Sequence, residues 1–247
     1  MLYSNDPKPD QEECQKIKEL IYETAPKFQN AQSIEAFFEL YQTMAEEPSL
    51  LRVVNIQKSP EVDPALIEEL KRRNYPADFV DLMRKRGNFY IEFGSGRMND
   101  LSFYLECADS NKCMLTRHGY LRFAGDGGGN WWVFDLKNPD NPIGFADHNE
   151  VWWDVEEATE TLGENYDVWY DSETGEYSND QGIDLSLAFD AEHNVLLDSP
   201  YFRKHFEEAV ETDEATSFLD WLKAMMEKQF KELADLANFD YPEKEKT

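Results

Sequence analysis

Hydrophobic residues near the start of the chain recur every three or four positions. The spacing is seen over residues 12–28 and predicts an amphipathic helix, and Pro26 is expected to mark its end. A second helix is expected after Ser33, because a serine hydroxyl is a good N-cap. The pattern therefore predicts a helical extension over residues 1–58, with residues 57–60 as a linker.

Prolines divide the next stretch into two shorter helices. Pro64 is expected to open the first of them. Asn74-Tyr75-Pro76 is expected to break it, because a proline disfavours helix at the preceding residue. Pro76 then starts the second helix, and Gly87 supplies its left-handed stop.

From residue 88 onward the pattern changes to short aromatic or β-branched runs separated by Gly, Asn, Asp and Pro, which predicts strands. The expected strands cover residues 89–93, 101–107, 115–123, 131–136 and 143–147, with weaker candidates at 166–170, 184–189 and 195–197. Aromatic and Met residues at helical spacing over 218–233 then predict a long closing helix. Residues 231–247 are expected to form its end and a frayed tail.

Composition shows a chain that should fold and that is strongly acidic. Of its 247 residues, 41% are hydrophobic and 14% aromatic, which is too many for a disordered acidic tail. It carries 24 Lys and Arg against 51 Asp and Glu, a formal net charge of -27. This charge argues against nucleic acid and against an anionic membrane surface as partners, because Lys and Arg carry such binding. A basic protein partner is expected instead.

The negative charge is concentrated in one part of the sequence. Residues 138–202 contain 17 Asp and Glu and no Lys or Arg. The rest of the chain holds 34 acidic and 24 basic residues. Two interpretations remain open for the segment, an ordinary solvated face and an acidic surface that contacts a partner.

The start of the sequence and the cysteines predict a cytoplasmic protein. Residues 1–6 lack the basic and apolar regions of a secretory signal, and no apolar stretch reaches 18 residues. Cys14, Cys107 and Cys113 form no CxxC motif, so free thiols in a reducing compartment are expected.

Glycines mark the most informative segment, which runs from residue 121 to residue 150 and predicts strand, glycine turn, strand, turn, strand. Positive φ angles are expected to be possible in the turn, and an amide side chain at its end is expected to cap it. The residues of this structural turn are Gly127, Gly128, Gly129 and Asn130.

Known chemical motifs do not fit this segment. A P-loop would need Lys and a hydroxyl after the glycines, and a dinucleotide site would need a helix there rather than a strand. The EF-hand spacing is also absent, so no metal and no cofactor is expected. A hydrolase using Asp126 with Asp147 or Glu150 stays an alternative, but no GxSxG, HExxH or Cys-His signature supports an enzyme.

The same residues resemble the core of the SUKH superfamily. The matching patterns are Phe-Ala-x-Asp-Gly-Gly-Gly-Asn-x-x-x-Phe-Asp-Leu and then Pro-Ile-x-Phe-x-Asp-His-x-Glu. Residues 75–83 resemble the opening helix of the family, and residues 217–222 its closing helix. The resemblance covers about residues 63 to 228.

This resemblance implies an α+β domain, with a mixed or antiparallel sheet flanked by helices, over residues 59–230. The helical extension 1–58 lies outside the family core, and an acidic insertion is expected near 155–212. One Trp of each of the pairs 131–132 and 152–153 is expected in the core, because successive strand residues face opposite ways.

The family includes a fungal cell-wall-synthesis regulator and many bacterial immunity proteins, so a binding role without catalytic residues is implied. The favoured hypothesis is an immunity protein that neutralises a toxin domain, such as a basic nuclease. A regulatory scaffold is the alternative. The expected partner-binding residues are Asp126, Trp131, Asp135, Asp147, His148, Glu150, Asp154, Glu156 and Glu157.

Overall fold

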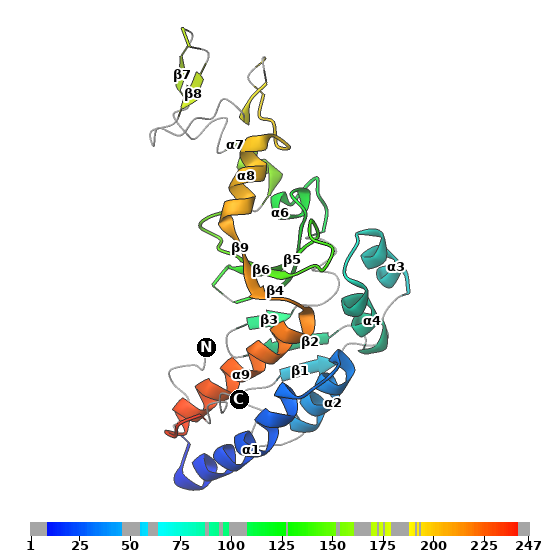
Figure 1. Ribbon diagram of the computed structural model, residues 1–247, viewed down its shortest axis with the longest axis vertical. Helices are drawn as coiled ribbons and strands as arrows, with labels where there is room; N and C mark the ends of the chain where they lie inside the picture. Colours follow the sequence, from blue (N-terminus) through cyan, green and yellow to red (C-terminus); the bar gives the residue numbers. More distant parts are fainter. Residues whose placement is uncertain are drawn as a thin grey trace. The chain divides into compact units, whose positions relative to one another are not determined.

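Helices and antiparallel strands form an α+β fold, as a computed structural model shows (Figure 1). The structure describes residues 9–45, 55–58, 64–86, 89–93, 96–98, 108–126, 128–151, 154–160, 169–171, 173–174, 176–178, 188–190, 192 and 194–241. None of the helices in these ranges has the length and apolar character that crossing a membrane requires.

The chain forms two compact units, and each is described by itself. Unit 1 comprises Met1–Leu101, Ala124–Gly128 and Ala215–Thr247, and unit 2 comprises Ser102–Phe123 and Gly129–Glu214. The sequence placed domain boundaries near residues 58 and 230. The units divide the chain at other positions, because the first and last helices pack together within unit 1.

Unit 1 is built mainly from helices whose apolar faces meet. Phe28 of α1 packs edge-on against Phe37 of α2 and Phe230 of α9, with ring centroids 5.0 and 5.8 Å apart. Phe79 of α4 packs against Phe218 of α9 in the same way, at 5.4 Å. The helices are α1 (Gln11–Gln29), α2 (Ile34–Ala45), α3 (Pro64–Arg72), α4 (Ala77–Arg86) and α9 (Phe218–Leu236).

The helix ends follow local chemistry, with one correction. The Ser33 hydroxyl accepts a hydrogen bond from the amide of Ala36, which confirms the expected cap of α2. Asn74 adopts a φ of 61° between α3 and α4, at the predicted break. The prediction that α1 ends at Pro26 was wrong. Pro26 lies in the last turn of α1, where its missing N–H removes a single hydrogen bond, and the helix continues to Gln29.

Strands complete unit 1. β1 (Asn55–Lys58), β2 (Phe89–Phe93) and β3 (Gly96–Met98) are antiparallel neighbours, and Ile56 lies opposite Ile91. The sequence predicted an all-helical extension over residues 1–58 and a linker over residues 57–60, and β1 corrects both, because it is a strand at the end of the extension and includes the first two residues of the expected linker. The four residues of β1 are too few to show a clear alternation, so their pairing with β2 decides their structure.

Unit 2 holds the strands that follow. Its elements are α6 (Met114–Arg117), β4 (Tyr120–Gly125), β5 (Trp131–Asp135), β6 (Ile143–Ala146), α7 (Val155–Glu160), β7 (Trp169–Asp171), β8 (Glu176–Ser178), α8 (Pro200–Ala209) and β9 (Val210–Ala215). The last residues of β4 and β9 belong to unit 1. The strand order is β4-β5-β6-β9, and β7 and β8 form a separate two-stranded sheet.

In unit 2 the structure differs from some of the predicted strands and confirms others. The strand expected over 115–123 is divided, because α6 occupies its first residues and Gly119, with a φ of 87°, turns the chain into β4. The strands expected over 131–136 and 143–147 are confirmed as β5 and β6. The strand expected over 101–107 and most of the one over 184–189 lie outside the described residues.

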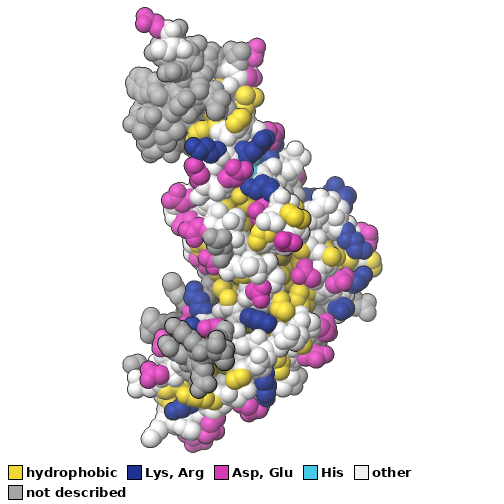
Figure 2. Space-filling model, in the orientation of Figure 1, with side chains coloured by type: hydrophobic (Ala, Val, Ile, Leu, Met, Phe, Trp, Pro, Cys, Tyr) yellow, Lys and Arg dark blue, Asp and Glu magenta, His cyan; other side chains and the backbone are white. Residues whose placement is uncertain are grey.

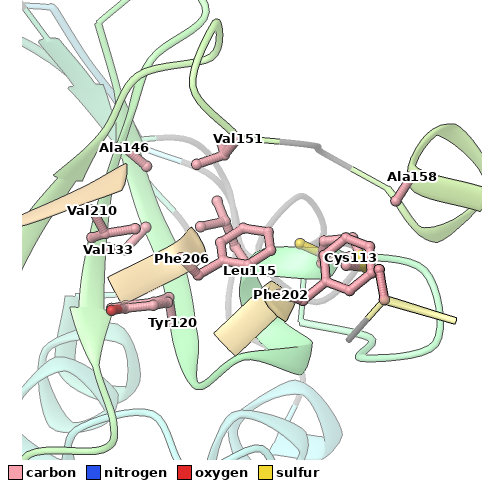
Figure 3. Close-up of a cluster of buried hydrophobic side chains, with 12 residues drawn as sticks. Cys113, Leu115, Tyr120, Val133, Ala146, Val151, Ala158, Phe202, Phe206 and Val210 are labelled. Atoms are coloured by element: carbon pink, nitrogen blue, oxygen red, sulfur yellow. The ribbon is translucent and has the colours of Figure 1, made fainter. Parts of the chain in front are cut away.

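The hydrophobic core of unit 2 lies under α8 (Figure 3). Phe202 and Phe206 of α8 are fully buried in it. They join Leu115 of α6, Tyr120 of β4 and side chains of the neighbouring strands. Other members are Cys113, Met114, Val133, Ala146, Val151, Ala158, Ala188 and Val210. This core holds β5 and β6, the two strands that carry the candidate site.

Candidate functional site

The glycine turn and the turn after β6 lie against each other. Trp131, the first residue of β5, is opposite Ala146, the last residue of β6. The residues just outside this pair are therefore brought together. We call residues 129–130 and 147–150 the turn pair.

Asn130 fixes His148 in the turn pair. The backbone amide of His148 donates to Oδ1 of Asn130 at 3.0 Å, and Nδ1 of the His148 ring lies 2.8 Å from the same oxygen. A backbone amide only donates, so the shared atom is the side-chain oxygen and not the nitrogen. Nδ1 must then carry the proton, and in the neutral ring Nε2 holds the lone pair. Among the described residues, Nε2 makes no hydrogen bond.

Gly129 allows the two turns to approach closely. Its φ is 104°, a conformation that side chains rarely adopt. A Cβ built on Gly129 would lie 3.2 Å from Cγ of His148, so the ring packs directly on the glycine backbone. This confirms at Gly129 the positive φ that was predicted for the glycine turn, and Gly127 lies outside the described residues.

Carboxylates border the histidine. Oδ1 of Asp147 accepts hydrogen bonds from the amide and the side-chain nitrogen of Asn149, at 2.8 and 2.9 Å. These bonds lower the pKa of Asp147, so its carboxylate stays ionised. It lies 3.7 Å from Nδ1 of His148. The side chain of Glu150 is exposed beyond it.

Three further candidate acids lie at the beginning of α7. The Asp154 carboxylate accepts from the amide of Glu157 at 2.6 Å and therefore caps the helix. Glu156 and Glu157 lie in its first turn, where negative charge complements the helix dipole. All three side chains are exposed, so a structural role and contact with a partner are compatible.

The other three candidates lie outside residues 129–130 and 147–150, and each makes contacts of its own. Asp135 is only 8% exposed and accepts from the amide of Lys137 at 2.9 Å, so it stabilises the turn after β5. Asp126 accepts from the amide of Gly128 at 2.7 Å and belongs to unit 1. Trp131 is half-buried beneath the guanidinium of Arg122, which lies 4.8 Å from its ring centroid.

The tryptophan pair at the start of β5 behaves as predicted. Trp132 is 4% exposed and packs against Phe145, while Trp131 is the less buried member. The second pair, residues 152–153, lies outside the described residues.

Unit 2 carries most of the net charge. Its sequence contains 25 Asp and Glu against 6 Lys and Arg, a net charge of -19, and unit 1 carries -8. Some of these acids form ion pairs, such as Asp198 with Arg117 at 2.5 Å. Among the described residues, Glu150, Asp154 and Glu156 form no ion pair. On the face shown in Figure 2, acidic side chains are spread among basic ones.

The sequence patterns did not indicate two partly buried histidines that pack against Phe206 in unit 2. The His118 ring stacks on Phe206 at 4.7 Å, and burial lowers its pKa to about 4. Burial also lowers the pKa of His205 on α8. Arg117, next to His118, borders a cavity of about 370 Å³ lined otherwise by residues 195–199. These contacts join residues about 80 positions apart, which periodicity cannot indicate.

No metal-binding arrangement of three or more His, Cys, Asp or Glu occurs in the described ranges. The turn pair offers hydrogen-bond acceptors and negative charge. It holds a ring nitrogen with a lone pair, together with Asp147 and Glu150, in the turns that adjoin β5 and β6.

Comparisons with known proteins add no relative. No protein-family model, no curated protein and no solved structure matches the chain. The function is therefore inferred from the sequence pattern, the turn pair and the charge of unit 2.

Proposed function

We propose that this chain is a SUKH-type binding protein of the cytoplasm, without enzymatic activity, that neutralises a toxin domain by docking an acidic surface on it. The favoured toxin is a nuclease, because a nuclease presents a basic surface to nucleic-acid phosphates. The resemblance of residues 121–150 to the SUKH core supports the immunity role.

One observation carries the proposal. Unit 2 has a net charge of -19, and exposed carboxylates without ion pairs among the described residues lie at the end of the turn pair and at the beginning of α7. These carboxylates are Glu150, Asp154 and Glu156. A negative surface attracts a basic protein over distances comparable to the Debye length, which is about 8 Å at physiological ionic strength.

The surface is also held in place. The capping bond of Asp154 fixes the start of α7, and the amide of Val155 donates to the carbonyl of Lys112 at 2.9 Å. Because the acids lie on backbone that is fixed by hydrogen bonds, little entropy is lost when a partner binds.

The test is inhibition of a nuclease toxin by a charge-neutralised variant. The probe is a purified nuclease toxin domain with a basic surface, taken from the gene next to that of this chain where that gene encodes one. The variant combines Glu150→Gln, Asp154→Asn and Glu156→Gln, in which asparagine keeps the helix cap. The control neutralises three exposed acids of unit 1 with Glu19→Gln, Glu39→Gln and Asp235→Asn.

The wild-type chain and the control are expected to inhibit the nuclease at equal concentrations. The neutralised variant should need about fivefold to about a hundredfold more protein, since three rim charges at a few tenths to about 1 kcal/mol each sum to about 1–3 kcal/mol. Equal inhibition by all three proteins would show that the acidic surface does not contribute to inhibition. A wild-type chain that binds a basic protein without neutralising any toxin would favour the scaffold role.

A further inference from the structure

Unit 2 contains a cavity of about 370 Å³ beside the start of α8. It is lined by Arg117, the last residue of α6, and by residues 195–199. We propose that this cavity binds one aliphatic residue of a partner polypeptide, whose peptide group meets the polar lining and whose side chain meets the apolar lining. The inference goes beyond the proposed function, because the cavity lies outside the turn pair and α7.

A buried hydroxyl in the lining points to a ligand. Ser199 is only 5% exposed, and its Oγ makes no hydrogen bond with the described residues. A serine at an N-cap ordinarily accepts from an amide of the first turn, but the Ser199 side chain makes no such bond to α8. Buried polar groups are nearly always hydrogen-bonded, because a buried group without a bond has lost its water for nothing. Since Ser199 lines the cavity, we infer that the missing partner binds there.

Arg117 and Asp198 add hydrogen-bonding groups of both kinds. Nε and Nη2 of Arg117 donate to Oδ1 and Oδ2 of Asp198, at 2.6 and 2.5 Å. The guanidinium carries further N–H groups, and these donate to none of the described residues. Each carboxylate oxygen of Asp198 can accept more than one bond, and this side chain is 69% exposed. The cavity therefore offers donors from Arg117 and an acceptor from Asp198.

The remaining lining is apolar and held in place. It consists of Val195, Leu196 and Leu197. The amide of Leu196 donates to the carbonyl of Ala188 at 2.7 Å, and the carbonyl of Leu196 accepts from the amide of Ser199 at 2.9 Å. Leu196 is 41% exposed, so the apolar lining reaches the surface of unit 2. Because these bonds exist before a ligand arrives, binding requires little ordering of the backbone.

An uncharged peptide group fits this lining better than an ion. The charges of Arg117 and Asp198 balance each other, and the net charge of -19 on unit 2 repels an anion. A peptide group has one acceptor for Arg117 or Ser199 and one donor for Asp198. An aliphatic side chain next to it would cover the apolar residues 195–197. The volume lies near the lower end of the range of about 300–1,000 Å³ for ligand pockets, which favours a single residue.

The experiment titrates the full chain, labelled with 15N, with N-acetyl-leucine methylamide and follows the backbone amides by NMR. N-acetyl-leucine, which has a carboxylate in place of the methylamide, is the charged control. N-acetyl-glycine methylamide is the control without an aliphatic side chain. The leucine methylamide is expected to shift the amides of Arg117 and residues 195–199 in a saturable way. Both controls should bind several-fold more weakly.

Variants test the two donors. Ser199→Ala removes the hydroxyl and should weaken binding of the leucine methylamide several-fold. Because this hydroxyl makes no bond inside the described fold, the thermal unfolding midpoint without ligand should not fall. Arg117→Lys keeps the charge but loses the planar set of donors, and it should also weaken binding. Ser110→Ala, at an exposed serine of unit 2, is the control for the substitution itself.

The absence of a saturable shift at Arg117 and residues 195–199 would overturn the inference. So would unchanged binding in Ser199→Ala, or binding of N-acetyl-leucine as tight as that of its methylamide. A lowered unfolding midpoint of Ser199→Ala would show that the hydroxyl has its partner inside the fold, which would also overturn it. The nuclease assay does not use the cavity residues, so the proposed function and this inference can fail separately.

Discussion

Aspartates in this chain shape the backbone as well as charging the surface. Asp126, Asp147 and Asp190 each accept a hydrogen bond from the amide two residues later, and Asp154 from the amide three residues later. Such bonds are the reason that Asp favours turns and helix caps. Neutralising these residues with Asn keeps the turn, while Ala would remove it.

Gly144 is a position where one added carbon should destabilise unit 2. A Cβ there would lie 2.8 Å from the carbonyl oxygen of Glu211 and 2.9 Å from Cγ1 of Val210. Because the nearer atom is backbone of β9, Gly144→Ala must shift a strand. We expect it to lower the free energy of unfolding by about 1–3 kcal/mol, measured by urea denaturation.

Gly128→Ala is the matched control. Its Cβ would meet the carboxylate oxygens of Asp126 at 3.3 Å, and these are the end of a side chain that can move. The expected change lies within about 0.5 kcal/mol. Equal losses for Gly128→Ala and Gly144→Ala would contradict the close approach of β6 to β9.

His118 should make stability depend on pH. Its pKa is about 4 in the folded protein, below the ordinary value of 6.5, because burial disfavours the charged ring. The unfolded chain therefore takes up the proton first as the pH falls. Stability from the neutral ring is complete above pH 6.5, declines as the pH falls through 6.5, and levels off below about 4.

Replacing His118 by glutamine separates its contribution to the pH dependence of stability from that of the other titratable groups. Between pH 7 and pH 4.5, the urea midpoint of the wild-type chain is expected to fall further than that of His118→Gln. Carboxylates with lowered pKa values, such as Asp198, destabilise both proteins in acid, so the difference reports on His118. Parallel curves for the two proteins would show that His118 does not titrate upon unfolding.

At the scale of the element, length and pattern decided what the sequence could predict. α9 was found because its buried Phe, Trp, Leu and Met residues repeat over 19 residues. α8 was missed, since only two of its ten residues, Phe202 and Phe206, are buried. β9, which follows α8 directly, has the acidic sequence VETDEA and no strand pattern, so its place beside β6 comes from tertiary packing.

Some features of the candidate site could likewise be predicted from the sequence, and others could not. The positive φ of Gly129 was predictable, because glycine before a strand is a turn signal. Asn130 was expected to cap its own turn, but its side chain holds His148, 18 residues away. The burial of Asp135 was not predictable either, since alternation alone does not say which face of β5 is covered.

At the scale of the whole molecule, charge separates the two units. Unit 2 carries -19 and unit 1 carries -8, although unit 1 is the longer of the two. Charge of one sign repels copies of the same chain and speeds the approach of a basic partner. We therefore expect a basic partner to bind unit 2.

The central claim is that electrostatic attraction guides this chain to a basic protein. The most direct test is the association rate constant with the nuclease toxin domain, measured by stopped flow at ionic strengths of about 0.01 and about 0.15 M. Over this range the Debye length falls from about 30 to about 8 Å. The account predicts at least about a tenfold slower association at the higher ionic strength. A rate constant that does not change between the two conditions would contradict it.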